Sequence, residues 1–261
     1  MACAIIGRLM KRGMSPQHID VVEPFEPARV QLGRTFGIQA QNVAGSFLEH
    51  ADLVLWAVKP QIFQQAAIEV APYTSHALHL SVAAGIRSQC VAAMLGTERV
   101  VRAMPNTPAL IGMGVSGLFA RSGVSQADRI IVIEVMTTTG RLLWLDSEEQ
   151  LDSVTALSGS GPAYVFYFME AMITAGVQMG LSWENAQLLT LATFSGASEL
   201  ACSSSDSPGV LRQRVTSQGG TTHAALLLME QNNIGVRFID AMTAAHARAK
   251  ALGDEFCQPE K

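Results

Sequence analysis

The residues Leu53–Val58, LVLWAV, form an uninterrupted apolar run, and Pro60 follows almost at once. An apolar run without polar alternation is typical of a parallel strand that is covered on both faces. Proline is favoured at the first position of a helix, so the run predicts a strand that leads directly into a helix. This pair of elements constrains the chain to a sheet that is buried between helices.

The same unit recurs through the first 145 residues. Apolar segments at His18–Glu23, Leu78–Ala84 and Val100–Ala103 predict further strands, and Pro27–Phe36 has helical spacing with Gly37 placed as its stop. Strands that alternate with helices in this way predict a parallel sheet with helices on both faces. Ligands of such sheets bind at the carboxyl ends of the strands.

The chain opens with a predicted helix, MACAIIGRLMKRG, that stops at Gly13. A dinucleotide-binding fold normally begins with a strand and a glycine-rich turn, and neither precedes this helix. Ala2 takes the helix-packing position of such a turn. We therefore expect that translation was assigned to an internal methionine and that the native chain begins roughly ten residues earlier.

From Gln150 onward the apolar spacing is helical and no strand is predicted. The expected helices are Leu151–Gly180, Trp183–Cys202, Thr221–Gln231 and Ile234–Leu252. The tail Gly253–Lys261 is expected to fray. The fold class is thus an α/β domain of the Rossmann type, without its first strand, at residues 1–147, followed by an all-α domain at 148–261.

Composition limits the partners of this chain. Its 261 residues exceed the usual span of one core, and 49% are apolar while only 15% are charged, which suggests surface that is buried in an oligomer. A net charge of −4 without a basic run predicts no nucleic-acid partner and no attachment to an anionic membrane. The segment Val154–Met169 is interrupted by glycine and proline, so we expect a buried helix there and no membrane span.

The 4 cysteines and 6 histidines are scattered, so no metal site is expected. Cysteines so far apart suit separate thiols in a reducing compartment better than a disulfide framework. The basic residues near the start flank only a short apolar run, which indicates neither a signal peptide nor an anchor. We expect a cytoplasmic protein.

The segment RVTSQGGTTHAALLLMEQ, Arg214–Gln231, is built to hold an anion. Adjacent glycines let backbone amides approach a ligand closely, and the first turn of a helix offers unpaired donors. The candidate residues are Ser217, Gly219, Gly220, Thr221 and Thr222. The alternative is that Ser217 or Thr221 merely caps the helix.

Three strand ends carry further candidates. AVKP supplies Ala57, Val58, Lys59 and Pro60, SVAAG ends in small residues that include Ala84, and AMPNTPA supplies Asn106 in a turn between prolines. Each alone has a plainer explanation as a solvated lysine or a rigid turn. Because carboxyl ends of parallel strands meet at one edge of a sheet, together they favour a dinucleotide crevice.

The motifs AVKPQ, AAG, MPNTPA, LSGSGPAYVF and VTSQGGTT, in this order and spacing, resemble those of the pyrroline-5-carboxylate reductases. The resemblance covers about Ala2 to Leu252. It implies an N-terminal Rossmann domain, a helical domain that dimerises, and often a ring of five dimers, a decamer. Two departures stand out: Gln218 replaces the family's usual proline, and the family's first strand and glycine turn lie upstream of Met1.

The resemblance implies reduction of 1-pyrroline-5-carboxylate to L-proline, with NADPH or NADH as the cofactor. Amides around Gly219, Gly220 and Thr221 would hold the substrate carboxylate, and the Thr222 hydroxyl would bond the ring nitrogen as the catalytic contact. Carried over by position, Ala57, Val58, Lys59, Pro60, Ala84 and Asn106 match segments that contact the cofactor.

Glu23 ends the second strand of the pattern, where an acidic side chain bonds a ribose 2′-OH and repels a 2′-phosphate. This position favours NADH, although Arg29 is near enough in sequence to reach a phosphate.

Two other functions compete with this interpretation. A truncated relative with an impaired cofactor site would act only as an oligomeric or carboxylate-binding protein. A hydroxy-acid dehydrogenase of similar architecture would need a lysine in its helical domain, and the sequence has none between Lys59 and Lys250.

Overall fold

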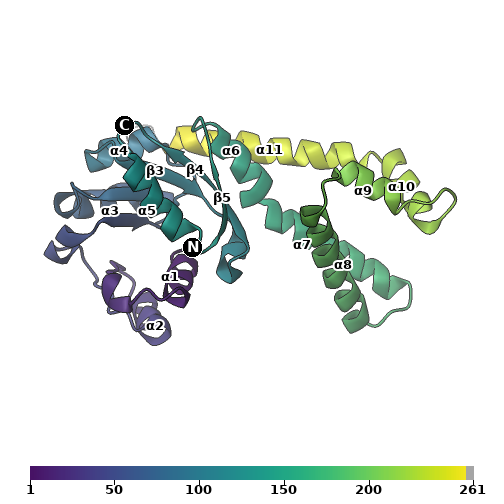
Figure 1. The fold of residues 1–261 in the computed structure, drawn as a ribbon, viewed down its shortest axis with the longest axis horizontal. Coiled ribbons are helices and arrows are strands. Elements are labelled where there is room, and N and C mark those ends of the chain that lie inside the picture. Colours follow the sequence, from purple (N-terminus) through teal and green to yellow (C-terminus); the bar gives the residue numbers. More distant parts are fainter. Residues whose placement is uncertain (257–261) are drawn as a thin grey trace. The chain divides into compact units, whose positions relative to one another are not determined.

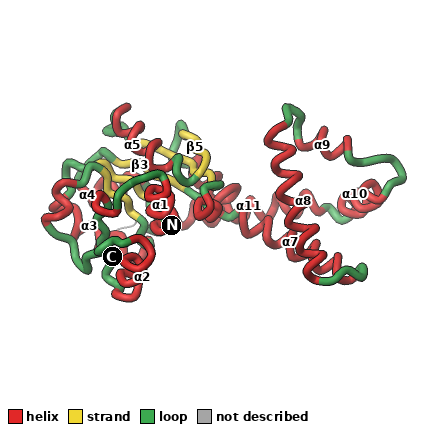
Figure 2. The backbone as a smooth tube through the Cα atoms, turned by 60° about the horizontal axis from the view of Figure 1, so that its bottom comes forward, coloured by secondary structure: helices red, strands yellow, loops and turns green. Residues whose placement is uncertain are grey.

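The computed structural model describes residues 1–256. It divides into two compact units, one formed by residues 1–160 together with the chain from Ala245 onward, and one formed by residues 161–244. Figure 2 shows that the strands all lie in the first unit, while the described part of the second is built from helices and loops.

The first unit contains a five-stranded sheet. Its strands are β1 (Leu53–Trp56), β2 (Leu78–Ser81), β3 (Val100–Met104), β4 (Gly114–Ala120) and β5 (Gly140–Trp144), and they lie side by side in this order. Strands β1, β2 and β3 are parallel, with Trp56 beside Ser81 and Ser81 beside Arg102. Strand β4 runs antiparallel to β3, and β5 is parallel to β4.

Helices cover both faces of this sheet (Figure 1). On one face, α3 (Pro60–Val70) and α4 (Ser88–Leu95) pack Phe63 and Val91 against the strands. On the other, α1 (Ala2–Lys11) and α5 (Gln126–Met136) pack Ile5 and Val132. Because side chains alternate along a strand, neighbours such as Val100 and Val101 enter opposite layers. The predicted α/β class is confirmed.

Two details of the predicted sheet are wrong. The expected strand His18–Glu23 begins as the end of a short 3₁₀ helix, Pro16–His18, and only Val22 forms an isolated bridge, with Gln41. Ile19 and Val21 instead pack with α1 and with α2 (Glu26–Phe36), so they take part in a small separate core. The expectation of an all-parallel sheet fails because β4 returns antiparallel to β3 after a connection that contains the 3₁₀ helix Thr107–Ile111.

Several predicted boundaries are confirmed. Helix α2 ends at Gly37, which adopts the left-handed conformation with φ of 69° that glycine tolerates without strain. Helix α1 is followed by Gly13, also at positive φ. The short helices Ser46–His50, Ala71–Tyr73 and Thr107–Ile111 complete the connections.

After β5, the described chain is helical. Its elements are α6 (Gln150–Val154), a π-helical turn (Thr155–Gly159), α7 (Gly161–Gln178), α8 (Trp183–Ser203), α9 (Pro208–Arg214), α10 (Thr221–Gln231) and α11 (Ile234–Glu255). Within the second unit α7 packs on α8, and Phe238 of α11 meets the rings of Tyr164 and Phe168 nearly edge to face. The predicted helical half is confirmed, whereas α9 was not foreseen.

The end of the chain differs from its prediction. Helix α11 runs on through Gly253, which is buried, so the expected fraying is wrong as far as Glu255. The rest of the predicted frayed tail, beyond Phe256, lies outside the described residues.

Residues 1–256 also bear on the expectations about membrane spans, metal sites and cysteine pairing. None of the helices there is long and apolar enough to cross a membrane. His, Cys, Asp and Glu side chains in the same range form no group of three that could hold a metal ion. Cys3 and Cys202 are free thiols, whereas Cys90 is disulfide-bonded, so the expectation of separate thiols is wrong at Cys90.

Candidate functional site

The candidate anion loop of the second unit is a tight turn between α9 and α10. The Gly220 amide donates to the Ser217 carbonyl at 3.0 Å, and Gly219 has φ of 76°. A side chain at Gly220 would press on the Ser217 carbonyl, since an added Cβ would lie 3.2 Å from that oxygen. The paired glycines therefore serve the turn itself.

The first turn of α10 is open. Helices α8 and α9 are capped by the side chains of Ser182 and Ser207, but α10 has Gly220 as its N-cap and no side-chain cap. The alternative that Ser217 or Thr221 caps this helix is therefore wrong. A glycine N-cap leaves the helix donors available to a ligand.

Among the described residues, three consecutive amides at the start of α10 have no partner: Thr221, Thr222 and His223. Two other amides of the loop are engaged within it, because Gly219 donates to His223 Nδ1 at 3.4 Å and Gly220 to Ser217. The free donors thus lie two residues further along the chain than the three amides considered from sequence, and only Thr221 belongs to both sets. Three parallel N–H groups at a helix N-terminus suit a carboxylate.

The first unit brings its three candidate strand ends to one edge. Since β1, β2 and β3 are parallel and in register, the segments that follow them share that edge: Ala57–Pro60, Val82–Gly85 and Pro105–Thr107. Their side chains are mostly small, which leaves backbone within reach of a ligand. This is the crevice in which open α/β sheets bind nucleotides.

Three of the candidate residues at this edge have clear structural positions. Pro60 is the first residue of α3, and Lys59 precedes it without capping the helix through its side chain. The Asn106 Oδ1 accepts from the Val115 amide at 3.0 Å, so this side chain joins the turn after β3 to the start of β4.

The loop after β2 is backed by the C-terminal end of α11, which belongs to the same unit. Gly85 has φ of 78°, and an added Cβ there would lie 3.2 Å from Leu252 and from Phe256. Glycine is required at this position both by the backbone conformation and by the close approach of the helix. The Ala84 segment is therefore held between the sheet and α11.

Comparison with known proteins identifies the family. The model described as NADP oxidoreductase, coenzyme F420-dependent, matches residues 1–85, and the model described as pyrroline-5-carboxylate reductase dimerisation matches residues 148–252. The pyrroline-5-carboxylate reductase of Pseudomonas aeruginosa is 40% identical over 260 residues, which cover 99% of this chain and 95% of that protein. The chain belongs to the pyrroline-5-carboxylate reductase family.

Solved structures of pyrroline-5-carboxylate reductases share the fold. The protein from Coxiella burnetii superposes with a TM-score of 0.88 at 36% identity, covering 96% of this chain and 94% of that one. The protein from Plasmodium falciparum, solved with NADP bound, gives a TM-score of 0.86 at 28% identity and covers 96% and 93% of the two chains.

Two motifs of the reductase family meet in the first unit. Gly159 closes the π-helical turn, and an added Cβ would lie 2.6 Å from the terminal methyl of Met104 at the end of β3. The π turn is held by the Ser160 amide, which donates to the Thr155 carbonyl at 2.8 Å. Such turns are frequent at functional sites. LSGSGPAYVF thus begins against the strand end that leads into Asn106.

The position considered for cofactor choice, Glu23, and the nearby Arg29 both bond to the chain's own backbone. The Glu23 carboxylate accepts from the Phe25 amide at 2.9 Å. The Arg29 guanidinium donates to the carbonyls of Glu23 and Pro24 at 2.9 and 2.7 Å. An acidic and a basic group therefore share this corner, and both are anchored to the same three-residue backbone segment.

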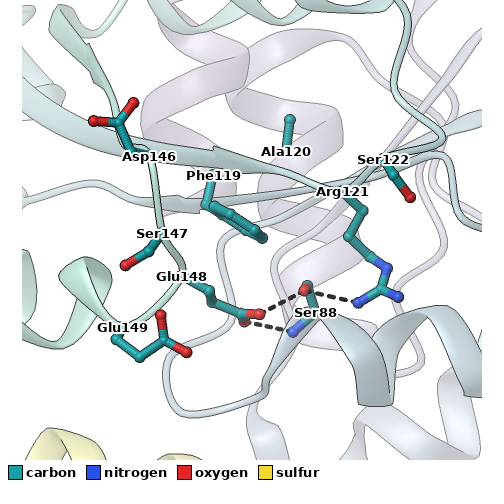
Figure 3. A pocket seen from close by; sticks show the side chains of 9 residues that line it. All are labelled: Ser88, Phe119, Ala120, Arg121, Ser122, Asp146, Ser147, Glu148 and Glu149. Atoms are coloured by element: carbon teal, nitrogen blue, oxygen red, sulfur yellow. Dashed lines mark hydrogen bonds between the residues drawn. The ribbon is translucent and has the colours of Figure 1, made fainter.

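One charged cluster was not foreseen. Glu148 Oε1 accepts from the Ser88 amide at 2.6 Å and from Arg102, and its Oε2 accepts from the Ser88 hydroxyl at 2.6 Å. Glu148 and Ser88 line a depression of about 380 Å³. Figure 3 shows both side chains there, with the Arg121 guanidinium also reaching the Ser88 hydroxyl. The members come from separate elements, so sequence spacing gives no signal for them. Glu148 forms an ion pair with Arg102, and Arg121 forms one with Glu98, so the cluster stabilises the start of α4.

Proposed function

We propose that this chain reduces 1-pyrroline-5-carboxylate to L-proline with a hydride from NADPH or NADH, the last step of proline synthesis. The observation that carries the proposal is the open first turn of α10, where three free amides lie next to the Thr222 hydroxyl. A seat for a carboxylate beside a neutral hydroxyl is what a small cyclic imino acid requires. Membership of the reductase family supports this substrate.

The edge formed by β1, β2 and β3 fits a dinucleotide, because the small residues that follow these parallel strands leave its backbone accessible. The residues that would hold the cofactor are Ala57, Val58, Lys59, Pro60, Ala84, Asn106 and Glu23. When bound there, the nicotinamide supplies the hydride that is added to C5 of the imine.

In the substrate loop, the free amides of Thr221, Thr222 and His223 bind the carboxylate. The Thr222 hydroxyl bonds the ring nitrogen and fixes which face of C5 is presented. Ser217, Gly219 and Gly220 contribute by shaping the turn. The loop needs no strong acid, since an imine can arrive protonated from water.

For cofactor choice we infer a preference for NADH. Glu23 at the end of the bridge with Gln41 supplies the acidic group that bonds a ribose 2′-OH. Because Arg29 is tied to the backbone carbonyls of Glu23 and Pro24, it is less free to receive a 2′-phosphate.

A second copy of the chain is the expected protein partner, and we infer a homodimer that assembles further into a ring such as a decamer. The second unit exposes many large apolar side chains, among them Tyr167, Met179, Leu188 and Leu228. An apolar surface of this kind marks an interaction site. The match of residues 148–252 to a dimerisation family supports a second copy as its occupant.

We further infer functional domains at residues 1–147 and 148–261, which the separate matches to residues 1–85 and 148–252 support. A cytoplasmic location completes the proposal, with neither nucleic acid nor membrane as a partner.

The proposal is tested at Thr222. Thr222→Ala is expected to lower kcat/KM for pyrroline-5-carboxylate by about a hundredfold or more, because it removes the contact that orients the ring nitrogen. Thr222→Ser keeps the hydroxyl and should retain most activity. Size-exclusion chromatography should show the same oligomer for all three proteins. Near-normal turnover by Thr222→Ala would remove Thr222 from the mechanism.

A further inference from the structure

The turn before α10 has the geometry of a type II β-turn. Its first carbonyl, Ser217, accepts from the fourth residue, Gly220, at 3.0 Å, and its third residue, Gly219, has φ of 76°. A type II turn requires positive φ at the third residue and favours proline at the second. Gln218 occupies that second position, so the chain lacks the residue that would restrict the turn in the unbound state.

His223 supplies a contact that links this turn to the helix. Its Nδ1 accepts from the Gly219 amide at 3.4 Å, four residues back along the chain. Nδ1 is the acceptor in this contact, which leaves Nε2 as the ring nitrogen that can donate. The bond spans Gly220, Thr221 and Thr222, and therefore fixes the turn relative to the three free amides and the Thr222 hydroxyl.

The geometry points to His223 as a positioning residue for the substrate: we propose that its side chain holds the loop in the binding conformation that proline at position 218 would otherwise favour. The inference deepens the proposed function and rests on it. A loop that is held in its binding conformation before the substrate arrives loses less entropy on binding. The His223 backbone amide belongs to the carboxylate seat, but substitution of the side chain leaves that amide in place.

The test is a set of single and double variants assayed with pyrroline-5-carboxylate. A neutral hydrogen bond of this kind contributes modestly, so His223→Ala should raise KM for the imine by about threefold to tenfold. The kcat and the KM for NAD(P)H should stay within about twofold of the wild-type values, because the His223 side chain orders the loop and transfers no proton.

Two substitutions should restore the KM. His223→Asn carries an acceptor oxygen close to the position of Nδ1, so it should behave nearly as the wild type. Gln218→Pro in the His223→Ala background should lower KM again, because proline restricts the turn and the Gln218 amide has no partner among the described residues to lose. His50→Ala, at an exposed histidine in the first unit, is the matched control and should leave KM unchanged.

Amide hydrogen exchange provides a readout that does not depend on turnover. Gly219 should exchange faster in His223→Ala than in the wild type, while the helix amides of α7 and α8 keep their protection. An unchanged KM in a folded His223→Ala protein, or a double variant no better than His223→Ala, would overturn the inference. If the wild type itself fails to reduce the imine, the proposed function fails instead, and unchanged Gly219 exchange would still overturn the role of His223.

Discussion

Among single residues, His79 carries a clear consequence for stability. Its ring lies in β2 with about 1% of its surface exposed, Nδ1 accepts from Trp56 Nε1 at 3.0 Å, and Nε2 donates to the Thr74 carbonyl at 3.2 Å. Both ring nitrogens are thus used by the neutral form. Burial lowers the pKa of His79 from 6.5 to about 4.

This shift predicts a loss of stability in mild acid. Between the two pKa values the unfolded chain binds a proton that the folded chain excludes, so unfolding becomes more favourable as pH falls below 6.5. From pH 7.5 to 5 the residue should remove about 2 kcal/mol from the free energy of unfolding. Urea titrations at both pH values measure this loss.

The control is His79→Asn, which keeps an acceptor for Trp56 and does not titrate. This variant should be less stable than the wild type at pH 7.5, but its free energy of unfolding should fall by less between pH 7.5 and 5. If both proteins lose the same free energy of unfolding between pH 7.5 and 5, the burial of His79 is not the cause of the acid sensitivity.

At the residue scale, the sequence located the loop but not its bonding. The glycines and threonines of the anion loop were found from residue type, whereas the pairing of Gly219 with His223 depends on a side-chain rotamer that no spacing reveals. Likewise Asn106 was found by its turn, but its bond to Val115 depends on the unforeseen strand β4. The roles proposed for these residues remain predictions.

Among elements, the start of α4 is held by a carboxylate from a distant part of the first unit. Ser88 begins this helix, and Glu148 accepts from both its amide and its hydroxyl. The same carboxylate faces Arg102, which has 7% of its surface exposed in β3. One side chain therefore connects α4, β3 and the segment before α6.

Removal of this charge should destabilise the fold. Glu148→Gln leaves the buried Arg102 guanidinium without its carboxylate, and such a loss costs about 3 kcal/mol or more. The urea midpoint at neutral pH measures the effect. Glu98→Gln is the matched control: it removes the carboxylate from the more exposed pair with Arg121 and should leave the midpoint nearly unchanged. Equal midpoints for wild type and Glu148→Gln would contradict the role of this carboxylate.

Helices and strands could be predicted from the sequence where a single pattern, such as an unbroken apolar run or helical apolar spacing, was strong. The bounds of α10 follow from Gly220 before it and the apolar spacing within it, and β1 follows from its unbroken apolar run. Strand β4 contains two glycines, and β5 alternates Arg141 and Leu143 on an exposed side, so neither has a strong strand signal. The strand expected at His18–Glu23 failed because it finds only one residue to pair with.

At the scale of the whole molecule, the division into a strand-rich and a helical part could be predicted because the hydrophobic period changes near Gln150. The assignment of the C-terminal end of α11 to the first unit could not, since the approach of Leu252 to Gly85 is a long-range contact. The apolar surface of α7 and α8 was anticipated only as an unusually apolar composition.

The central claim is that this chain is a pyrroline-5-carboxylate reductase, and a coupled assay tests it most directly. The purified chain is mixed with pyrroline-5-carboxylate and either NADH or NADPH, and loss of absorbance at the reduced nicotinamide band is followed together with formation of L-proline. We expect proline to form in proportion to oxidised cofactor, with a larger kcat/KM for NADH. A larger value with NADPH would overturn the cofactor preference alone, whereas a folded, oligomeric chain that forms no proline with either cofactor would contradict the account.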